Sequence, residues 1–124
     1  MALFESGEMY LETILILSGG GLVRAIDISE YMGYSKPSVS RALSKLRDEG
    51  YITVGRDGGI QFTESGRTVA EKIYERHNIL AEYFLSIGVD AETAREDACR
   101  IEHVISDPTF AAIKRLLETT HTKT

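Results

Sequence analysis

The chain has 124 residues, of which 43% are hydrophobic and 27% charged, and its formal net charge is −5. These shares are ordinary for a soluble globular protein and exclude a largely disordered chain. A single cysteine excludes an internal disulfide, so the fold does not depend on oxidation and a reducing cytoplasm is expected. The apolar run at 14–17 is too short to span a bilayer and follows acidic residues, so we expect neither a signal peptide nor a membrane anchor.

The charged residues are unevenly distributed along the chain. An acidic total argues weakly against nucleic-acid binding, because domains that bind nucleic acids usually carry a basic excess. Residues 36–47, however, contain four basic residues and no acidic one, whereas acidic residues collect near the N-terminus and over 90–107. The sequence therefore predicts one local basic patch on an acidic protein.

Three helices are predicted in the first fifty residues. The first covers 8–17 and ends at the glycines of "SGGG", and the second runs from about Asp27, a suitable N-cap, to Met32. The third follows Ser35 as its cap, has Pro37 in its first turn, and ends at Gly50. Its apolar residues recur at i, i+4 and i+7, which predicts one buried stripe, formed by Val39, Leu43 and Leu46.

A small hairpin and three further helices are predicted after residue 50. The hairpin pairs 51–54 with 60–62 around the turn sequence "RDGG". A long helix then runs from Thr63, its cap, to about Ile87, a fifth helix covers about 90–106, and Pro108 lies in the first turn of a sixth. We therefore predict a mainly α fold: a winged helix-turn-helix DNA-binding domain over 1–66 and a helical dimerisation and metal-binding domain over 67–124.

The third helix has the features of a DNA-reading helix. Serines crowd its start, where hydroxyl and N–H groups can bind phosphate, and Arg56 lies at the turn of the hairpin that follows. Arg41 is suited to a bidentate contact with guanine, while Lys36, Lys45 and Arg56 suit phosphates. The alternative is that these basic residues only keep the helix surface soluble. The predicted DNA-contacting residues are Arg24, Ser35, Lys36, Pro37, Ser38, Ser40, Arg41, Lys45 and Arg56.

A second group of polar residues suggests a metal site. Cys99, Glu102 and His103 are spaced i, i+3, i+4, and Met9 and Glu12 are spaced i, i+3, so each group is expected on one helix face. Together with His77 they offer sulfur, oxygen and nitrogen donors, a mixture that suits a divalent transition metal. The alternative is structural: a small hydrophobic cysteine and a hydrogen-bonded Glu–His pair.

Four stretches carry a resemblance to a known family. They are "EMYLETI", "YSKPSVSRALSKLRDEGYI", "FTESGRTVAEKI" and, most specifically, "DACRIEHVISD". The chain resembles the diphtheria toxin repressor and manganese transport regulator family of metal-dependent repressors over nearly its whole length. The last stretch is similar to the iron-responsive branch almost residue for residue.

The resemblance implies a set of metal ligands. Met9, Cys99, Glu102 and His103 fall on the positions of the iron-type primary site. Glu12 and His77 match ligands of the manganese-type branch, and the resemblance implies that they complete a larger or two-metal site. The chain departs from the iron branch at its accessory site, where Ala81 and Arg95 stand in place of a carboxylate and a histidine. The SH3-like third domain of longer members is not expected here.

The function expected from this resemblance is a cytoplasmic, dimeric repressor that binds palindromic operators of metal-homeostasis genes in response to Fe²⁺. Mn²⁺ is the alternative effector, and Zn²⁺, Ni²⁺ and Co²⁺ are expected to bind in vitro. One rival is a winged-helix regulator that senses no metal. Another, an enzyme with Cys99 as nucleophile and His103 as base, is not expected, because no oxyanion-type glycine loop or third orienting group is evident. Neither a membrane nor a small organic substrate is expected as a partner.

Overall fold

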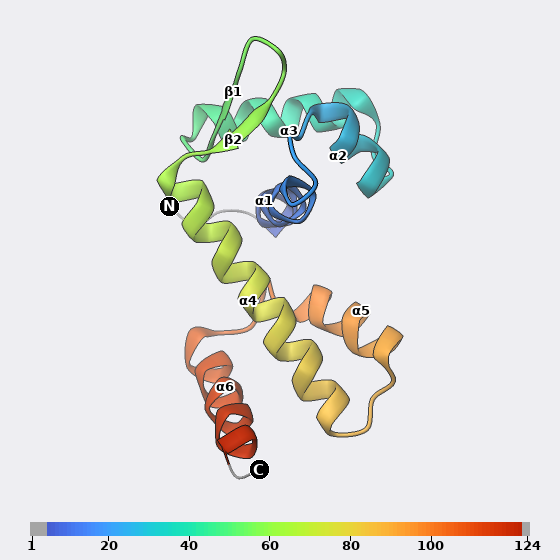
Figure 1. The fold of residues 1–124 in the computed structure, drawn as a ribbon, viewed down its shortest axis with the longest axis vertical. Coiled ribbons are helices and arrows are strands. Elements are labelled where there is room, and N and C mark those ends of the chain that lie inside the picture. The colour runs from blue at the N-terminus through green and yellow to red at the C-terminus, as the bar shows by residue number, and fades with distance from the viewer. Residues whose placement is uncertain (1–4, 123–124) are drawn as a thin grey trace. The chain divides into compact units, whose positions relative to one another are not determined.

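The structure is a computed structural model that describes residues 5–122, and the chain divides into two compact units. The first unit ends at Glu71 and the second begins at Lys72, so the boundary falls within a long helix. Six helices and one two-stranded antiparallel sheet make up the described residues, which confirms the predicted fold class (Figure 1). None of these helices is long and apolar enough to cross a membrane.

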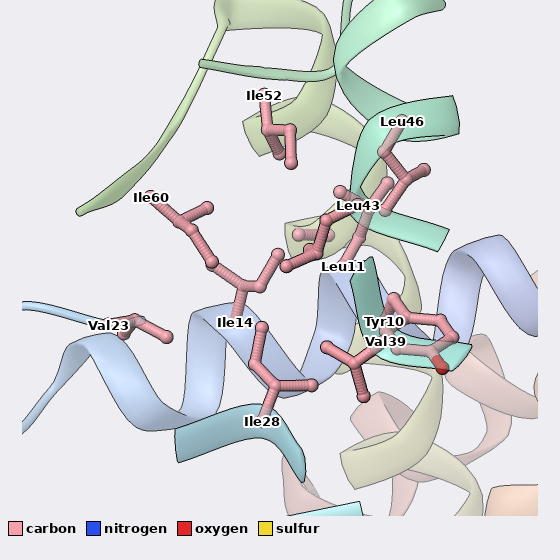
Figure 2. Close-up of a cluster of buried hydrophobic side chains, with 11 residues drawn as sticks. Tyr10, Leu11, Ile14, Val23, Ile28, Val39, Leu43, Leu46, Ile52 and Ile60 are labelled. Carbon is pink, nitrogen blue, oxygen red and sulfur yellow. The ribbon is translucent and has the colours of Figure 1, made fainter. Parts of the chain in front are cut away.

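The first unit is built around three helices and the hairpin. It contains α1 (Glu5–Ser18), α2 (Ala25–Met32), α3 (Lys36–Asp48), β1 (Ile52–Val54), β2 (Ile60–Phe62) and the start of α4 (Glu64–Ser86). Figure 2 shows how side chains from these elements converge on one apolar core. The stripe predicted for the third helix lies in this core, where Val39, Leu43 and Leu46 are all buried.

The second helix begins two residues earlier than the sequence predicted. Arg24, not Asp27, is the N-cap residue, and its backbone is extended at φ −125° and ψ 167°. Asp27 lies within the first turn, where its carboxylate accepts a hydrogen bond from the Arg24 N–H at 2.9 Å. An acidic residue at this third position satisfies a free backbone donor of the helix start as well as a cap would, so the two positions are easily confused from sequence.

The ends of α3 agree with the sequence. The Ser35 hydroxyl oxygen accepts a hydrogen bond from the Ser38 N–H, and Pro37 lies in the first turn. At the other end Gly50 has φ +85°, and the N–H of Tyr51 donates back to the carbonyl of Leu46. This left-handed glycine closes the last turn and directs the chain into β1.

The hairpin forms a wing that is attached to the residues before α2. Its strands pair Ile52 with Phe62 and Val54 with Ile60. A single antiparallel bridge joins Ile60 to Val23, whose carbonyl accepts from the Ile60 N–H at 2.8 Å. The wing is therefore joined by main-chain bonding to a segment almost forty positions away in sequence.

The start of α4 packs closely against the start of the wing. The Thr63 hydroxyl accepts from the Gly66 N–H, as expected for an N-cap, and donates to the carbonyl of Gly50. A Cβ on Gly66 would lie 1.8 Å from the carbonyl oxygen of Tyr51. Only glycine fits at this crossing of two backbones.

The second unit consists of the rest of α4 with α5 (Ala91–Ile101) and α6 (Asp107–Thr122). Its core joins Leu80, Ala98 and Phe110. Asp90 caps α5, but this helix ends at Ile101 and not near Ser106 as predicted. The reason is tertiary: the carbonyls of Glu102 and Ile105 accept hydrogen bonds from a buried arginine, and Ser106 already caps α6 by accepting from the Thr109 N–H.

Candidate metal centre and nucleic-acid interface

The carboxylate of Glu102 lies between two imidazoles in the second unit. Its Oε2 lies 3.0 Å from Nδ1 of His77, and its Oε1 lies 3.2 Å from Nε2 of His103. The Glu102 side chain is 0% exposed, that of His103 1% and that of His77 18%. One carboxylate and two imidazole nitrogens gathered away from water match the oxygen and nitrogen donors of a divalent transition-metal site.

Arg76 fixes the backbone that carries Glu102. It is the residue before His77 on α4 and is itself buried. Its Nη1 donates to the carbonyls of Glu102, at 3.2 Å, and Ile105, at 2.9 Å, while its Nη2 pairs with Asp107. The guanidinium also lies 5.4 Å from the centre of the Phe110 ring. Arg76 therefore holds the end of α5 and the start of α6 against α4.

Cys99 differs from its two neighbours in burial. It lies on α5 and is exposed, whereas Glu102 and the His103 imidazole are buried. Because α5 ends at Ile101, His103 belongs to the turn that follows the helix, and the expectation that all three share one helix face is not met. The role of Cys99 as a ligand stays a prediction.

The remaining predicted ligands, Met9 and Glu12, lie on α1 in the first unit. The hydroxyl of Thr13 donates to the Met9 carbonyl within this helix at 2.9 Å. Of the six predicted ligands, two thus belong to the first unit and four to the second, where three of the four meet. The positions of the accessory site offer no donors of the iron-branch type, because Ala81 packs against the core of its unit and Arg95 is exposed.

Tyr10, next to Met9, connects α1 with the turn before α3. Its ring is buried, and its centre lies 6.2 Å from that of Tyr34. Burial raises the pKa of the Tyr10 hydroxyl, and the charge of Tyr34 adds to this while Arg41 opposes it. Tyr10 therefore stays neutral and acts as a packing contact between the helix that bears Met9 and the turn that leads into α3.

The outer face of α3 is basic at its centre. Lys36, Arg41 and Lys45 are exposed, and a shallow depression lies along this face, lined by Ser40, Arg41, Ser44, Lys45, Asp48 and Glu49. At the helix start, Ser35 donates to the Ser38 hydroxyl at 2.9 Å, and Arg41 donates to the same oxygen at 3.4 Å. Three of the predicted DNA-contacting side chains are thus linked to one another on a solvent-facing surface, next to Pro37, which is exposed as well.

Two predicted contacts, Arg24 and Arg56, lie away from α3 and its cap, beside the wing and on it. Arg56 is exposed at the turn between β1 and β2. Arg24 is also exposed, but its Nε donates to the carbonyl of Asp57, in that same turn, at 3.0 Å. The sequence predicted Arg24 as a DNA contact only. The hydrogen bond between Arg24 and Asp57 joins residues 33 positions apart, and no local sequence pattern indicates it.

Models of known families match both halves of the chain. Residues 2–60 match the iron dependent repressor, N-terminal DNA binding domain. Residues 63–123 match the iron dependent repressor, metal binding and dimerisation domain. The basic face of α3 falls in the first match. The cluster formed by His77, Glu102 and His103, called the Glu102 cluster below, falls in the second.

Named proteins are similar to most of the chain. The diphtheria toxin repressor of Corynebacterium diphtheriae is 36% identical over 120 residues, which are 94% of this chain and 52% of that protein. The transcriptional regulator MntR of Escherichia coli O157:H7 is 34% identical over 94 residues, 76% of this chain and 61% of that protein. The solved structure of the manganese regulator SloR, at 26% identity, has a TM-score of 0.80 and covers 95% of this chain and 55% of that one. The chain spans about half the length of the diphtheria toxin repressor that it matches.

Proposed function

The chain belongs to the iron-dependent repressor family, and from this premise we propose that it is a transcriptional repressor that binds operator DNA as a homodimer when a divalent transition metal is bound. The observation that carries the proposal is the meeting of Glu102 with His77 and His103 in the unit that matches a metal-binding and dimerisation domain. These residues fit such a metal, since a buried carboxylate and two imidazoles are donors that it prefers. A regulator of this kind meets DNA in the cytoplasm, where we place it.

Fe²⁺ is the metal that we propose first. The thioether of Met9 and the thiol of Cys99 are soft donors, which suit iron-type use better than a site of carboxylates alone. Glu12 and His77, however, match the manganese-type branch. The diphtheria toxin repressor and the transcriptional regulator MntR are similar to this chain at 36% and 34% identity, and the manganese regulator SloR at 26%. Mn²⁺ is therefore the second candidate. Zn²⁺, Ni²⁺ and Co²⁺ are expected to bind in vitro whichever metal acts in the cell.

The proposed mechanism is a shift between conformations. Met9 and Glu12 belong to the DNA-binding unit, and Cys99, Glu102 and His103 belong to the dimerisation unit, so shared ligation would tie the two together. A bound cation would supply coordinate bonds to donors of both units. Shared ligation would then favour the conformations in which the two reading helices of a dimer can bind DNA together. The size of this shift is set by the difference in the donors' affinity for the cation between the conformations.

DNA recognition is assigned to α3 and the wing. Arg41 would read a guanine edge, and Lys36, Lys45 and Arg56 would bind phosphates, with Ser35, Ser38 and Ser40 supporting the backbone contacts. One short reading helix on a protein of net charge −5 would bind weakly by itself. Two copies related by a two-fold axis would bind both halves of a palindromic site, which raises the affinity above that of one reading helix.

The experiment measures DNA affinity with and without metal. A duplex would first be selected from a random pool under anaerobic conditions with Fe²⁺, and its affinity would then be measured by fluorescence anisotropy with Fe²⁺, with Mn²⁺ and with chelator. We expect binding only with metal. Equal affinity in all three conditions would refute metal sensing and leave a winged-helix regulator, and failure to select any duplex would refute DNA binding.

A pair of variants connects this response to the Glu102 cluster. Glu102→Gln removes the negative charge between the imidazoles, so we expect the metal response of DNA binding to disappear. Glu96→Gln is the matched control, because Glu96 is an exposed glutamate on the same helix, α5. A full metal response in Glu102→Gln would place the sensing site elsewhere.

A further inference from the structure

The backbone of Arg24 is held by hydrogen bonds on both sides. Its N–H donates to the carboxylate of Asp27 at 2.9 Å, and its carbonyl accepts from the N–H groups of Asp27, at 3.0 Å, and Ile28, at 3.3 Å. The preceding residue, Val23, is joined to β2 through its bridge with Ile60. Both backbone groups of Arg24 are thus engaged, and its side chain extends from a fixed point at the start of α2.

The side chain of Arg24 reaches the tip of the wing. Its Nε donates to the carbonyl of Asp57 at 3.0 Å, and its Cδ would lie 3.8 Å from a Cβ built on Gly58. The aliphatic part of Arg24 therefore runs beside the turn while its Nε binds the turn's backbone. Val23 and Arg24, two successive residues, hold the wing at its strand and at its tip.

The wing turn is closed by its own hydrogen bonds around the same residue. The Gly55 N–H donates to the Gly59 carbonyl at 2.9 Å, and the Gly58 N–H donates to the Gly55 carbonyl at 3.0 Å. The Asp57 carboxylate turns inward to accept from the Gly59 N–H at 2.9 Å. Asp57 thus has its carboxylate bound within the turn and its carbonyl bound to Arg24, which leaves its neighbour Arg56 as the exposed cation of the tip.

We infer that Arg24 is a positioning residue that anchors the wing tip through the Asp57 carbonyl and so presents Arg56 to the DNA backbone. The inference rests on the proposed DNA binding. A wing turn whose backbone is already held by Arg24 loses less conformational entropy when Arg56 meets a phosphate. A fixed wing tip therefore binds more tightly than a mobile one. Arg24 thereby contributes to affinity through Arg56, in place of the direct DNA contact that its charge suggested.

A double-mutant cycle separates the two roles. DNA affinity is measured for Arg24→Ala, Arg56→Ala and the double variant, in metal-loaded full-length protein, over a range of salt concentrations. We expect Arg56→Ala to lower the magnitude of the slope of log affinity against log salt by about 0.9, which is one lost phosphate contact. Arg24→Ala should lower the affinity with a smaller change of slope, and it should cost no further affinity when Arg56 is already replaced. Arg24→Ala combined with Lys45→Ala is the matched control, for which the losses should add.

Additive losses of affinity for Arg24 and Arg56, with the magnitude of the slope falling by about twice 0.9 in the double variant, would overturn the inference in favour of a direct phosphate contact by Arg24. Unchanged affinity in Arg24→Ala would overturn it as well. The anchoring itself is tested without DNA, by NMR order parameters of the Gly58 and Gly59 amides, which should fall in Arg24→Ala. Unchanged order would refute the anchor, whereas a wild-type protein that binds no duplex at all would refute the proposed function instead.

Discussion

Nδ1 of His77 lies 3.0 Å from Oε2 of Glu102, although the two residues are 25 positions apart in the sequence. One stands in the middle of α4 and the other caps the end of α5. Arg76, beside His77, binds the carbonyl of the same Glu102 at 3.2 Å. Two successive residues of α4 thus determine where the backbone and the side chain of Glu102 lie.

His77→Ala should weaken metal binding. The substitution removes one of the two imidazoles at the Glu102 carboxylate, and loss of even an indirect partner of a metal site typically costs about 10–100-fold in affinity. Isothermal titration with Mn²⁺, which is stable in air, measures this directly. Asn78→Ala, at the exposed next position, is the control and should bind as the wild type does. Equal affinities in the two variants would mean that His77 has no part in metal binding, either as a ligand or as a partner of one.

Arg76→Met should destabilise the fold. Methionine has a similar length but cannot donate, so the carbonyls of Glu102 and Ile105 lose a charged hydrogen-bond donor, at a cost of about 2–3 kcal/mol. Urea unfolding would show this as a lower midpoint with an unchanged slope. Lys114→Met is the control, because Lys114 pairs with Glu75 on the surface and surface pairs contribute little. Equal losses in the two variants would contradict the role assigned to Arg76.

Gly66→Ala should be disruptive in spite of the small change. The added methyl group would meet the backbone of Tyr51 at 1.8 Å, which requires α4 and the wing to separate. Overpacking of this kind typically costs about 1–3 kcal/mol. Thermal unfolding followed by circular dichroism measures the loss, with the exposed neighbour Ser65→Ala as control. A variant as stable as the control would show that the two backbones separate without cost.

Asp90→Asn should remove part of the acid sensitivity of the protein. Hydrogen bonds from the Thr93 backbone N–H and side chain lower the pKa of Asp90 in the folded state. Its contribution is therefore present above the ordinary aspartate pKa and is lost as the pH falls through the lowered value. We expect wild type and variant to converge in stability as the pH is lowered below about 4, which urea midpoints across the acid range would detect. A constant difference at every pH would contradict the shift.

The local features of the fold could be predicted because neighbouring residues determine them. The buried stripe of α3, the Ser35 cap, the Thr63 cap and the hairpin over 51–62 all follow from spacing and turn residues, and the structure confirms them. What the sequence did not indicate depends on partners far along the chain. Arg76 follows a glutamate and precedes a histidine, a setting typical of a surface arginine. It is buried, and its guanidinium binds carbonyls 26 and 29 positions away.

The candidate site shows the same division. Residue types and a resemblance brought His77, Glu102 and His103 into one predicted ligand set, and the structure brings these three together. The premise that Cys99, Glu102 and His103 share a helix face was wrong, because the competing contacts of Arg76 and the cap of α6 end α5 at Ile101. The end of a helix depends on what surrounds it, which periodicity alone does not reveal.

The wing turn takes its shape from glycines and main-chain hydrogen bonds, helped by the Asp57 carboxylate within the turn and by Arg24 beside it. The neighbouring positions 53, 54, 56 and 61 carry exposed side chains that the turn does not need. Residues at these positions can therefore be exchanged without rebuilding the frame that carries them. Under the proposed function, a library varied at these positions, on an unchanged backbone, would be a direct way to retarget the wing to duplexes with a different groove width or flanking sequence.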